Sequence, residues 1–137
     1  MKKIKRLVIP VLTAAFGVGL FSATSVYALR DIDPIDFYVS YSYDKDVPGD
    51  AYKVHDGQTD AGKYVVNLTE SPGSANVTTT LHNVDHAYRG SGIVQRGTRA
   101  SFYNVGYAGY TYHLNLKRTY SGGDIYVKGS WSPDSQD

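Results

Sequence analysis

The chain has 137 residues, 13 of them tyrosine, and no cysteine. Without cysteine there is no disulfide framework, no cysteine nucleophile and no lipidated N-terminal cysteine, so the core alone must hold the fold. The formal net charge of +1 depends on the N-terminal segment, because residues 29–137 carry 10 lysines and arginines against 13 acidic residues. That balance lacks the basic footprint of a nucleic-acid-binding protein, so we expect no nucleic-acid partner.

Residues 1–28 have the pattern of a secretory signal peptide. Lysines and an arginine within residues 2–6 precede a mostly apolar run at 7–21, and Val26-Tyr27-Ala28 fits the small-residue cleavage rule. The apolar run is short for the ~20 residues that span a bilayer. We therefore expect a Sec-type signal cleaved after Ala28, a secreted (extracellular) protein, and no membrane span after cleavage.

Cleavage after Ala28 would leave 109 residues, which by length make one domain. Residues 29–36 are acidic and contain Pro34, which predicts a flexible lead-in. Residues 37–132 are predicted to form the β domain, and residues 133–137 a C-terminal tail.

Apolar residues alternate with polar ones from Phe37 onward, and no segment has a helical period. Turn signals such as Pro48-Gly49 and Pro72-Gly73 separate the runs. About seven short strands predict an all-β fold, a single antiparallel β-sandwich or a small barrel. The residues expected to face the core are Phe37, Val39, Tyr41, Tyr43, Tyr64, Val66, Leu68, Val77, Thr79, Leu81, Tyr112, Leu114, Leu116, Ile125, Val127, Gly129 and Trp131.

The only tryptophan lies six residues before the C-terminus. Trp131 is in phase with Ile125 and Val127, so it is expected to face the core and to hold the last strand in place. Pro133 cannot donate to a sheet ladder, so the strand is expected to stop before it.

The segment from Asn104 to Ser135 ends in Gly-Ser-Trp-Ser-Pro-Asp-Ser. It resembles a family of small secreted proteins of Gram-positive bacteria that is catalogued as a domain of unknown function. The resemblance implies export and a compact domain, and it implies no activity. In size, signal and aromatic content the chain is also similar to small exported bacteriocins that act at the cell envelope.

Tyrosine is the compositional feature that most suggests binding, because its ring offers wide apolar area with a polar tip. By strand phase, Tyr38, Tyr107, Tyr110 and Tyr126 are expected to be exposed, and we predict them as binding residues. The Gly106–Tyr110 segment is the expected position of a binding patch. The alternative is that these tyrosines serve only the scaffold, because tyrosine also favours strands.

Two polar clusters suggest metal ions without specifying a site. Asp44, Asp46 and Asp50 resemble the start of a calcium loop, but no helices flank them and later ligand positions hold other residues, so a solvated acidic turn is favoured and calcium stays open. His82, Asp85 and His86 are close in sequence, although zinc needs three or four ligands and His55 and His113 lie elsewhere. We predict no metal site and no cofactor.

No nucleophile elbow, phosphate loop or metalloprotease motif is present, and Glu70 is the only glutamate. The sequence therefore predicts a protein that is not an enzyme and that acts by binding at a cell surface or cell wall. The partner would be wall glycan, a lipid-linked wall precursor or a surface protein. The alternative is a bacteriocin-like antimicrobial protein. The cations available to an anionic partner are Arg89, Arg96, Arg99, Lys117 and Arg118.

Overall fold

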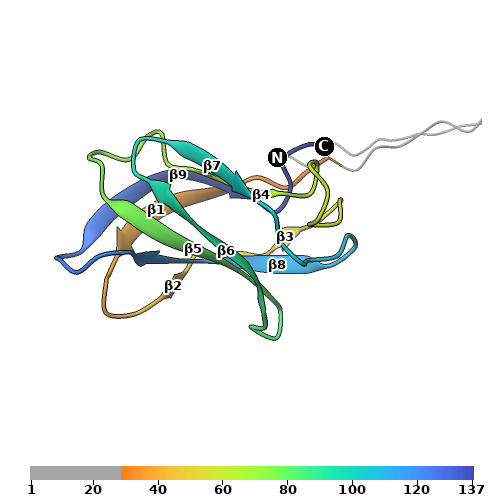
Figure 1. Cartoon of the computed structure of the whole chain (residues 1–137), viewed down its shortest axis with the longest axis horizontal. Helices are drawn as coiled ribbons and strands as arrows, with labels where there is room; N and C mark the ends of the chain where they lie inside the picture. The colour runs from red at the N-terminus through yellow and green to blue at the C-terminus, as the bar shows by residue number, and fades with distance from the viewer. Residues whose placement is uncertain (1–28) are drawn as a thin grey trace, which may run out of the picture.

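The computed structural model describes residues 29–137, which contain nine strands in two antiparallel sheets and no helix (Figure 1). The first sheet has the order β1 (Asp33–Val39), β9 (Ile125–Ser132), β4 (Tyr64–Asn67) and β7 (Arg99–Phe102). The second has the order β2 (Lys45–Asp46), β8 (Thr111–Arg118), β5 (Asn76–Asn83) and β6 (Tyr88–Gln95), and β3 (Ala51–Tyr52) also pairs with β8.

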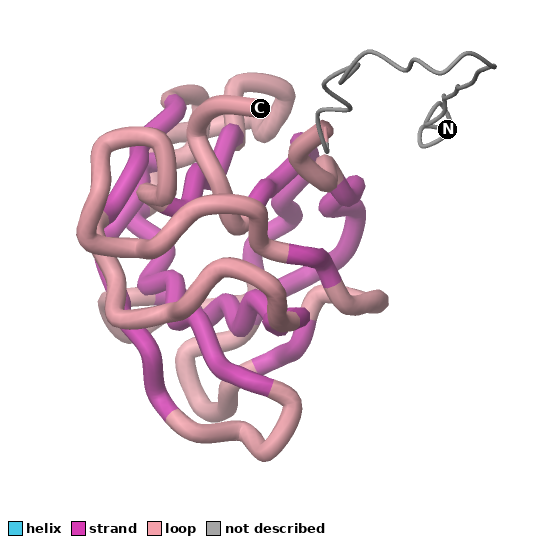
Figure 2. The backbone as a smooth tube through the Cα atoms, turned by 90° about the vertical axis from the view of Figure 1, so that its right-hand side faces the viewer, coloured by secondary structure: helices cyan, strands magenta, loops and turns pink. Residues whose placement is uncertain are grey.

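The prediction of an all-β antiparallel fold is confirmed, in the form of a sandwich of two sheets rather than a closed barrel. The view turned by 90° shows strands and connecting loops throughout the described part (Figure 2). The predicted signal peptide and its cleavage site lie outside the described residues. From Leu29 to Asp137, no helix long and apolar enough to cross a membrane is found.

The core lies between the two sheets and follows the two-residue alternation of the sequence. Tyr64, Val66 and Leu68 are buried on one side, and Leu114 and Leu116 on the other, as predicted. The other confirmed core residues are Val39, Val77, Thr79, Leu81, Tyr112, Ile125, Val127 and Trp131.

Thr79, the one polar residue among those predicted to be inward, is satisfied within the core. Its Oγ1 lies 2.8 Å from the hydroxyl of Tyr64 and donates to the carbonyl of Gly92 at 3.1 Å. Burial raises the pKa of Tyr64, which therefore stays a neutral hydrogen-bonding group.

The prediction that Tyr41 and Tyr43 face the core is wrong, because their side chains are 44% and 61% exposed. The cause is the end of β1 at Val39. The side chain of Ser40 accepts a hydrogen bond from the backbone N–H of Ser42 at 2.9 Å, and this local bond turns the chain out of the strand. The ring of Tyr41 lies instead on the surface under Nζ of Lys117, 5.6 Å from its centroid.

The flexible lead-in predicted at residues 29–36 is not what the structure shows, because β1 begins at Asp33 and its residues pair with β9 in register. Ile35, within the predicted lead-in, is only 1% exposed. Pro34 is tolerated because β1 is an edge strand, where a missing N–H costs no ladder bond. Before the strand, Asp31 accepts a hydrogen bond from the backbone N–H of Tyr52 at 2.6 Å, which fastens this segment to β3.

Residues 133–137, predicted as a tail, begin as a buried structural element, because Pro133 and Asp134 are enclosed by the protein. Asp134 is fully buried beside the equally buried Lys53, with 3.3 Å between Oδ1 and Nζ. The Lys53 amine also donates to the carbonyls of Gly62 and Pro133. We call residues 131–135, which close this end of the sandwich, the C-terminal clip.

The carboxylate of Asp134 also serves the backbone around Lys53. Its two oxygens accept hydrogen bonds from the N–H groups of Val54, at 2.7 Å, and His55, at 3.1 Å. Burial lowers the pKa of Lys53, and the adjacent Asp134 opposes that shift. The clip therefore depends on the Lys53–Asp134 pair. Both members of this pair make their hydrogen bonds to groups of the protein.

Candidate binding groove

The loop between β7 and β8, residues 103–110, carries two exposed tyrosines, and hydrogen bonds to the rest of the protein fix its backbone. We call it the groove loop. Tyr107 and Tyr110 are 66% and 64% exposed. The carbonyl of Gly106 accepts from Gly57 N–H at 2.8 Å, and Gly109 N–H donates to the carbonyl of Lys53 at 2.8 Å. Tight hydrogen bonding of a loop whose side chains face solvent is the arrangement of a pre-organised binding surface.

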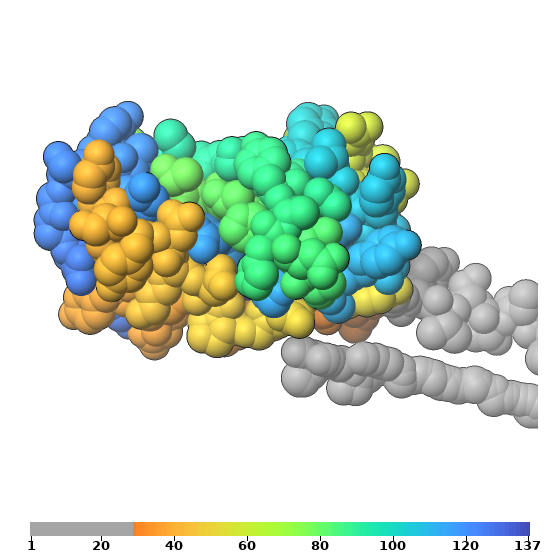
Figure 3. Space-filling view, turned by 90° about the horizontal axis from the view of Figure 1, so that it is seen from below, coloured from red at the N-terminus to blue at the C-terminus, as the bar shows by residue number. Residues whose placement is uncertain are grey.

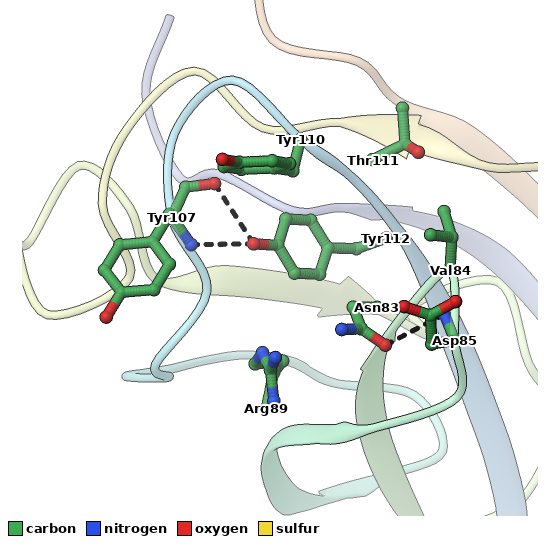
Figure 4. A pocket seen from close by; sticks show the side chains of 8 residues that line it. All are labelled: Asn83, Val84, Asp85, Arg89, Tyr107, Tyr110, Thr111 and Tyr112. Atoms are coloured by element: carbon green, nitrogen blue, oxygen red, sulfur yellow. Dashed lines mark hydrogen bonds between the residues drawn. The ribbon is translucent and has the colours of Figure 1, made fainter.

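The hydroxyl of Tyr112 is the internal support of this loop. It accepts a hydrogen bond from the backbone N–H of Tyr107 at 2.7 Å and donates to the carbonyl of the same residue at 3.1 Å (Figure 4). Burial raises the pKa of Tyr112, with Arg89 among the smaller opposing influences, so the hydroxyl keeps the proton that it donates.

Gly106 allows this close approach. A Cβ at this position would lie 3.0 Å from the Tyr112 ring and 3.0 Å from Oδ1 of Asn104. The same Oδ1 accepts the N–H of Gly106 at 3.0 Å. Asn104 is buried, and its amide donates to the carbonyl of Gly62, so one side chain ties its own loop to the segment around Gly62.

A hollow of about 290 Å³ lies between this loop and the turn that joins β5 to β6. Figure 4 shows the ring of Tyr112 at its centre, with Tyr107 and Tyr110 on the loop side and Asn83, Asp85 and Arg89 on the opposite side. In Figure 3 the green surface of the β5–β6 hairpin adjoins the blue surface of the segment leading into β8. We call this hollow the tyrosine groove; it is lined by Asn83, Val84, Asp85, Arg89, Tyr107, Tyr110, Thr111 and Tyr112.

The groove combines aromatic surface with a few polar groups of both charges. Oδ1 of Asn83 accepts from the N–H groups of Asp85, at 3.0 Å, and Ala87, at 2.8 Å, which sets the shape of the turn. The Arg89 side chain donates to the carbonyl of Tyr88 at 2.9 Å. A mostly apolar hollow with a small number of placed polar groups is typical of a small-molecule site.

The four tyrosines predicted as binding residues divide into two places. Tyr107 and Tyr110 share the tyrosine groove. Tyr38 and Tyr126 are cross-strand partners on β1 and β9, with ring centroids 5.4 Å apart. The Tyr126 hydroxyl donates to Asp36, which raises the pKa of Tyr126. This second pair lies on the outer face of a sheet, and neither of its tyrosines lines the tyrosine groove.

Asn83 was not predicted as a groove residue, and Tyr112 was predicted only as core. The ring of Tyr112 is indeed buried, but its hydroxyl reaches the groove loop. The register of β5 against β8 brings the two together, because Asn83 is the partner of Tyr112. The sequence shows both strands but not their pairing. The only signal for Asn83 and Tyr112 as groove residues was that each lies where its strand meets a turn.

Two of the three acidic residues considered for calcium, Asp46 and Asp50, have separate structural partners. Asp46 accepts from the side-chain amide of Asn115 at 3.0 Å, and Asp50 lies 2.9 Å from Nδ1 of His113. The rings of His86 and His113 stack at 5.5 Å, and His82 lies 6.4 Å from His86. Among the described residues, no three histidine, aspartate or glutamate side chains form a group that could hold a metal ion.

Comparison of the chain with protein-family models, curated proteins and solved structures finds no match. The resemblance of residues 104–135 to small exported proteins of Gram-positive bacteria therefore stays a prediction. The structure does assign a role to the most specific part of that segment, because Trp131, Ser132, Pro133 and Asp134 are all buried in the C-terminal clip.

Proposed function

We propose that this is an exported, non-enzymatic protein that binds a component of a cell wall or cell surface in the tyrosine groove. The observation that carries the proposal is the exposure of Tyr107 and Tyr110 on a loop whose backbone is held by hydrogen bonds at each residue from Gly106 to Tyr110. Exposed aromatic rings held in place lose little entropy on binding and supply large contact areas.

The groove lining favours binding over hydrolysis. A glycosidase needs two carboxyl groups across the scissile bond, and Asp85 carries the only carboxyl group that lines this hollow. The remaining lining groups are rings, an amide, a hydroxyl and the guanidinium of Arg89. Such groups orient and hold a ligand without supplying an acid–base pair.

The test is retention of the purified protein on insoluble wall sacculi of Gram-positive bacteria. We expect the protein to sediment with the sacculi, and Tyr107→Ala or Tyr110→Ala to weaken retention by about tenfold or more, as for truncated aromatic anchors. Tyr38→Ala is the matched control, because Tyr38 is an equally exposed tyrosine, 61%, that lies outside the groove.

Two results would contradict the proposal. One is the absence of retention, and the other is retention that all three variants preserve. A parallel growth assay with the same proteins separates binding from killing. Inhibition of growth that needs Tyr107 and Tyr110 would favour the bacteriocin-like alternative, in which the same groove takes a wall precursor.

A further inference from the structure

A second hollow adjoins the tyrosine groove on the far side of the groove loop. It has a volume of about 360 Å³ and lies between residues 56–59 and residues 105–107. Tyr107 lines both hollows and is 66% exposed, so its side chain is the shared wall between them. Figure 4 shows its ring pointing away from Tyr112, on the side of the loop opposite Asp85.

The size of the hollows suits a ligand that occupies both. Small-molecule sites usually enclose about 300–1,000 Å³, and each hollow is close to the lower end of that range. Each hollow has room for a ring-sized group. Two hollows in series, with an exposed aromatic ring between them, fit a chain of such groups.

The backbone around Tyr107 argues against an extended peptide that binds through main-chain hydrogen bonds. The N–H and C=O of Tyr107 are both taken by the hydroxyl of Tyr112. Ala108 N–H donates to Asp56, and Gly109 N–H and Tyr110 C=O pair with the backbone of Lys53. Peptide capture by strand addition needs an open row of such groups, and the bonds made by Tyr107, Ala108 and Gly109 interrupt any such row along this loop.

The side chains on offer match the two kinds of surface on a sugar ring. The faces of a pyranose carry C–H groups that pack on aromatic rings, and its edge carries hydroxyls that need donors and acceptors. Tyr107 and Tyr110 supply the rings. Arg89 and Asn83 supply polar groups in the first hollow, and Gln58 supplies an exposed amide in the second.

From this geometry we infer that the ligand is an extended oligosaccharide with a unit in each hollow and at least one further unit over the ring of Tyr107, so that a disaccharide in the first hollow does not reach the second. The inference rests on the proposed function and names the ligand class of the same site. It predicts that recognition depends on the length of the glycan as well as on its presence.

The experiment uses glycan strands released from the sacculi of the retention assay, separated by length from disaccharide to octasaccharide, with calorimetry on the purified protein. We expect the affinity to rise steeply with length and then level off once both hollows are filled. Tyr107→Ala should lower the affinity for long strands by about tenfold or more. Gln58→Ala should lower the affinity for long strands and leave the affinity for the disaccharide unchanged, because only long strands reach the second hollow.

Tyr38→Ala again serves as the control and should leave the whole length series unchanged. Equal affinity for short and long strands, or a loss in Gln58→Ala that is independent of length, would overturn the inference and leave the proposed function intact. Competition for sacculi by released stem peptides but not by glycan strands would do the same. Failure of the proposed function has a different signature, because sacculi would then not retain the protein at all.

Discussion

The C-terminal clip and the groove loop both pack on Lys53, and they use their side chains and backbones in opposite ways. In the clip, side chains turn inward: Asp134 holds the Lys53 amine and two backbone N–H groups. In the groove loop, the backbone turns inward, with bonds from Gly109 to the Lys53 carbonyl and from Lys53 N–H to Tyr110. The clip therefore uses its carboxylate entirely inside the protein, whereas the groove loop presents its tyrosines to solvent.

The contrast shows that a segment with a specific motif and a segment that lines the groove need not be the same. The segment Trp-Ser-Pro-Asp-Ser carries the most specific part of the predicted resemblance, and its first four residues are buried in the fold. Gly-Tyr-Ala-Gly-Tyr has no recognisable motif, and its tyrosines line the groove. Changes in the clip should therefore alter stability, and changes on the groove loop should alter binding.

The largest expected effect comes from breaking the clip. Asp134→Ala leaves the Lys53 charge buried without its partner and removes the acceptor of two N–H groups, so we expect the free energy of unfolding to fall by about 3–5 kcal/mol. Denaturant titration monitored by the fluorescence of Trp131 measures this change. Retention on sacculi, corrected for the folded fraction, should not change, because the Lys53 bonds to the groove loop come from its backbone.

The same variant has an expected pH dependence. The pKa of Lys53 is already lowered by burial, and loss of Asp134 removes the main opposing influence. The unfolded state then binds more protons than the folded state, so the deficit should shrink as the pH rises toward the ordinary lysine value of 10.5. Asp137→Ala is the control, because its ion pair with Arg30 is exposed, and it should cost at most about 1 kcal/mol. Equal losses in the two variants would mean that the clip is not a structural element.

A smaller effect, on both stability and binding, is expected at the base of the groove loop. In Gly106→Ala the new methyl group would press on the Tyr112 ring and on Asn104, each 3.0 Å away. We expect a loss of about 1–3 kcal/mol together with weaker retention on sacculi, because the loop must shift. Gly123→Ala is the matched control, because a Cβ there meets nothing within 4 Å and should change neither quantity. Full retention by Gly106→Ala would show that the loop does not need this geometry to bind.

The alternation of residues was enough to predict an all-β fold and most of the core, because most of the longer strands bury alternate residues. It failed at Tyr41 and Tyr43, where a side-chain hydrogen bond of Ser40 ends the strand. It also failed at the two termini. Ile35 and Asp134 are buried by pairing with segments about 80 to 95 residues away, such as β9 for the first and Lys53 for the second.

The candidate site was predicted only in part, because the sequence shows local patterns but not the pairing of distant segments. Exposure of Tyr107 and Tyr110 follows from local sequence, and both line the groove. The partners Asn83 and Arg89 come from another hairpin, and only the pairing of β5 with β8 brings that hairpin alongside. Tyr38 and Tyr126 satisfied the same local criterion, but they form a separate pair on a sheet face.

The smallest expected change in stability gives the sharpest comparison, because it removes one hydroxyl from each of two buried tyrosines. Tyr112→Phe deletes the support of the groove loop, and Tyr64→Phe deletes a hydroxyl that bonds to Thr79 in the core. Each should cost about 0.5–1.5 kcal/mol, the net value of one hydrogen bond. Thr79 still donates to Gly92 in the second variant, so no group is left unpaired there.

Binding should distinguish these two variants although stability does not. Without the Tyr112 hydroxyl, the N–H and C=O of Tyr107 lose their common partner, and the shared wall between the two hollows is no longer held in one position. We therefore expect Tyr112→Phe to weaken retention on sacculi severalfold while Tyr64→Phe retains full binding. Equal retention by both variants would show that binding does not need the hydrogen bonds of the Tyr112 hydroxyl. The exposed rings alone would then have to account for recognition.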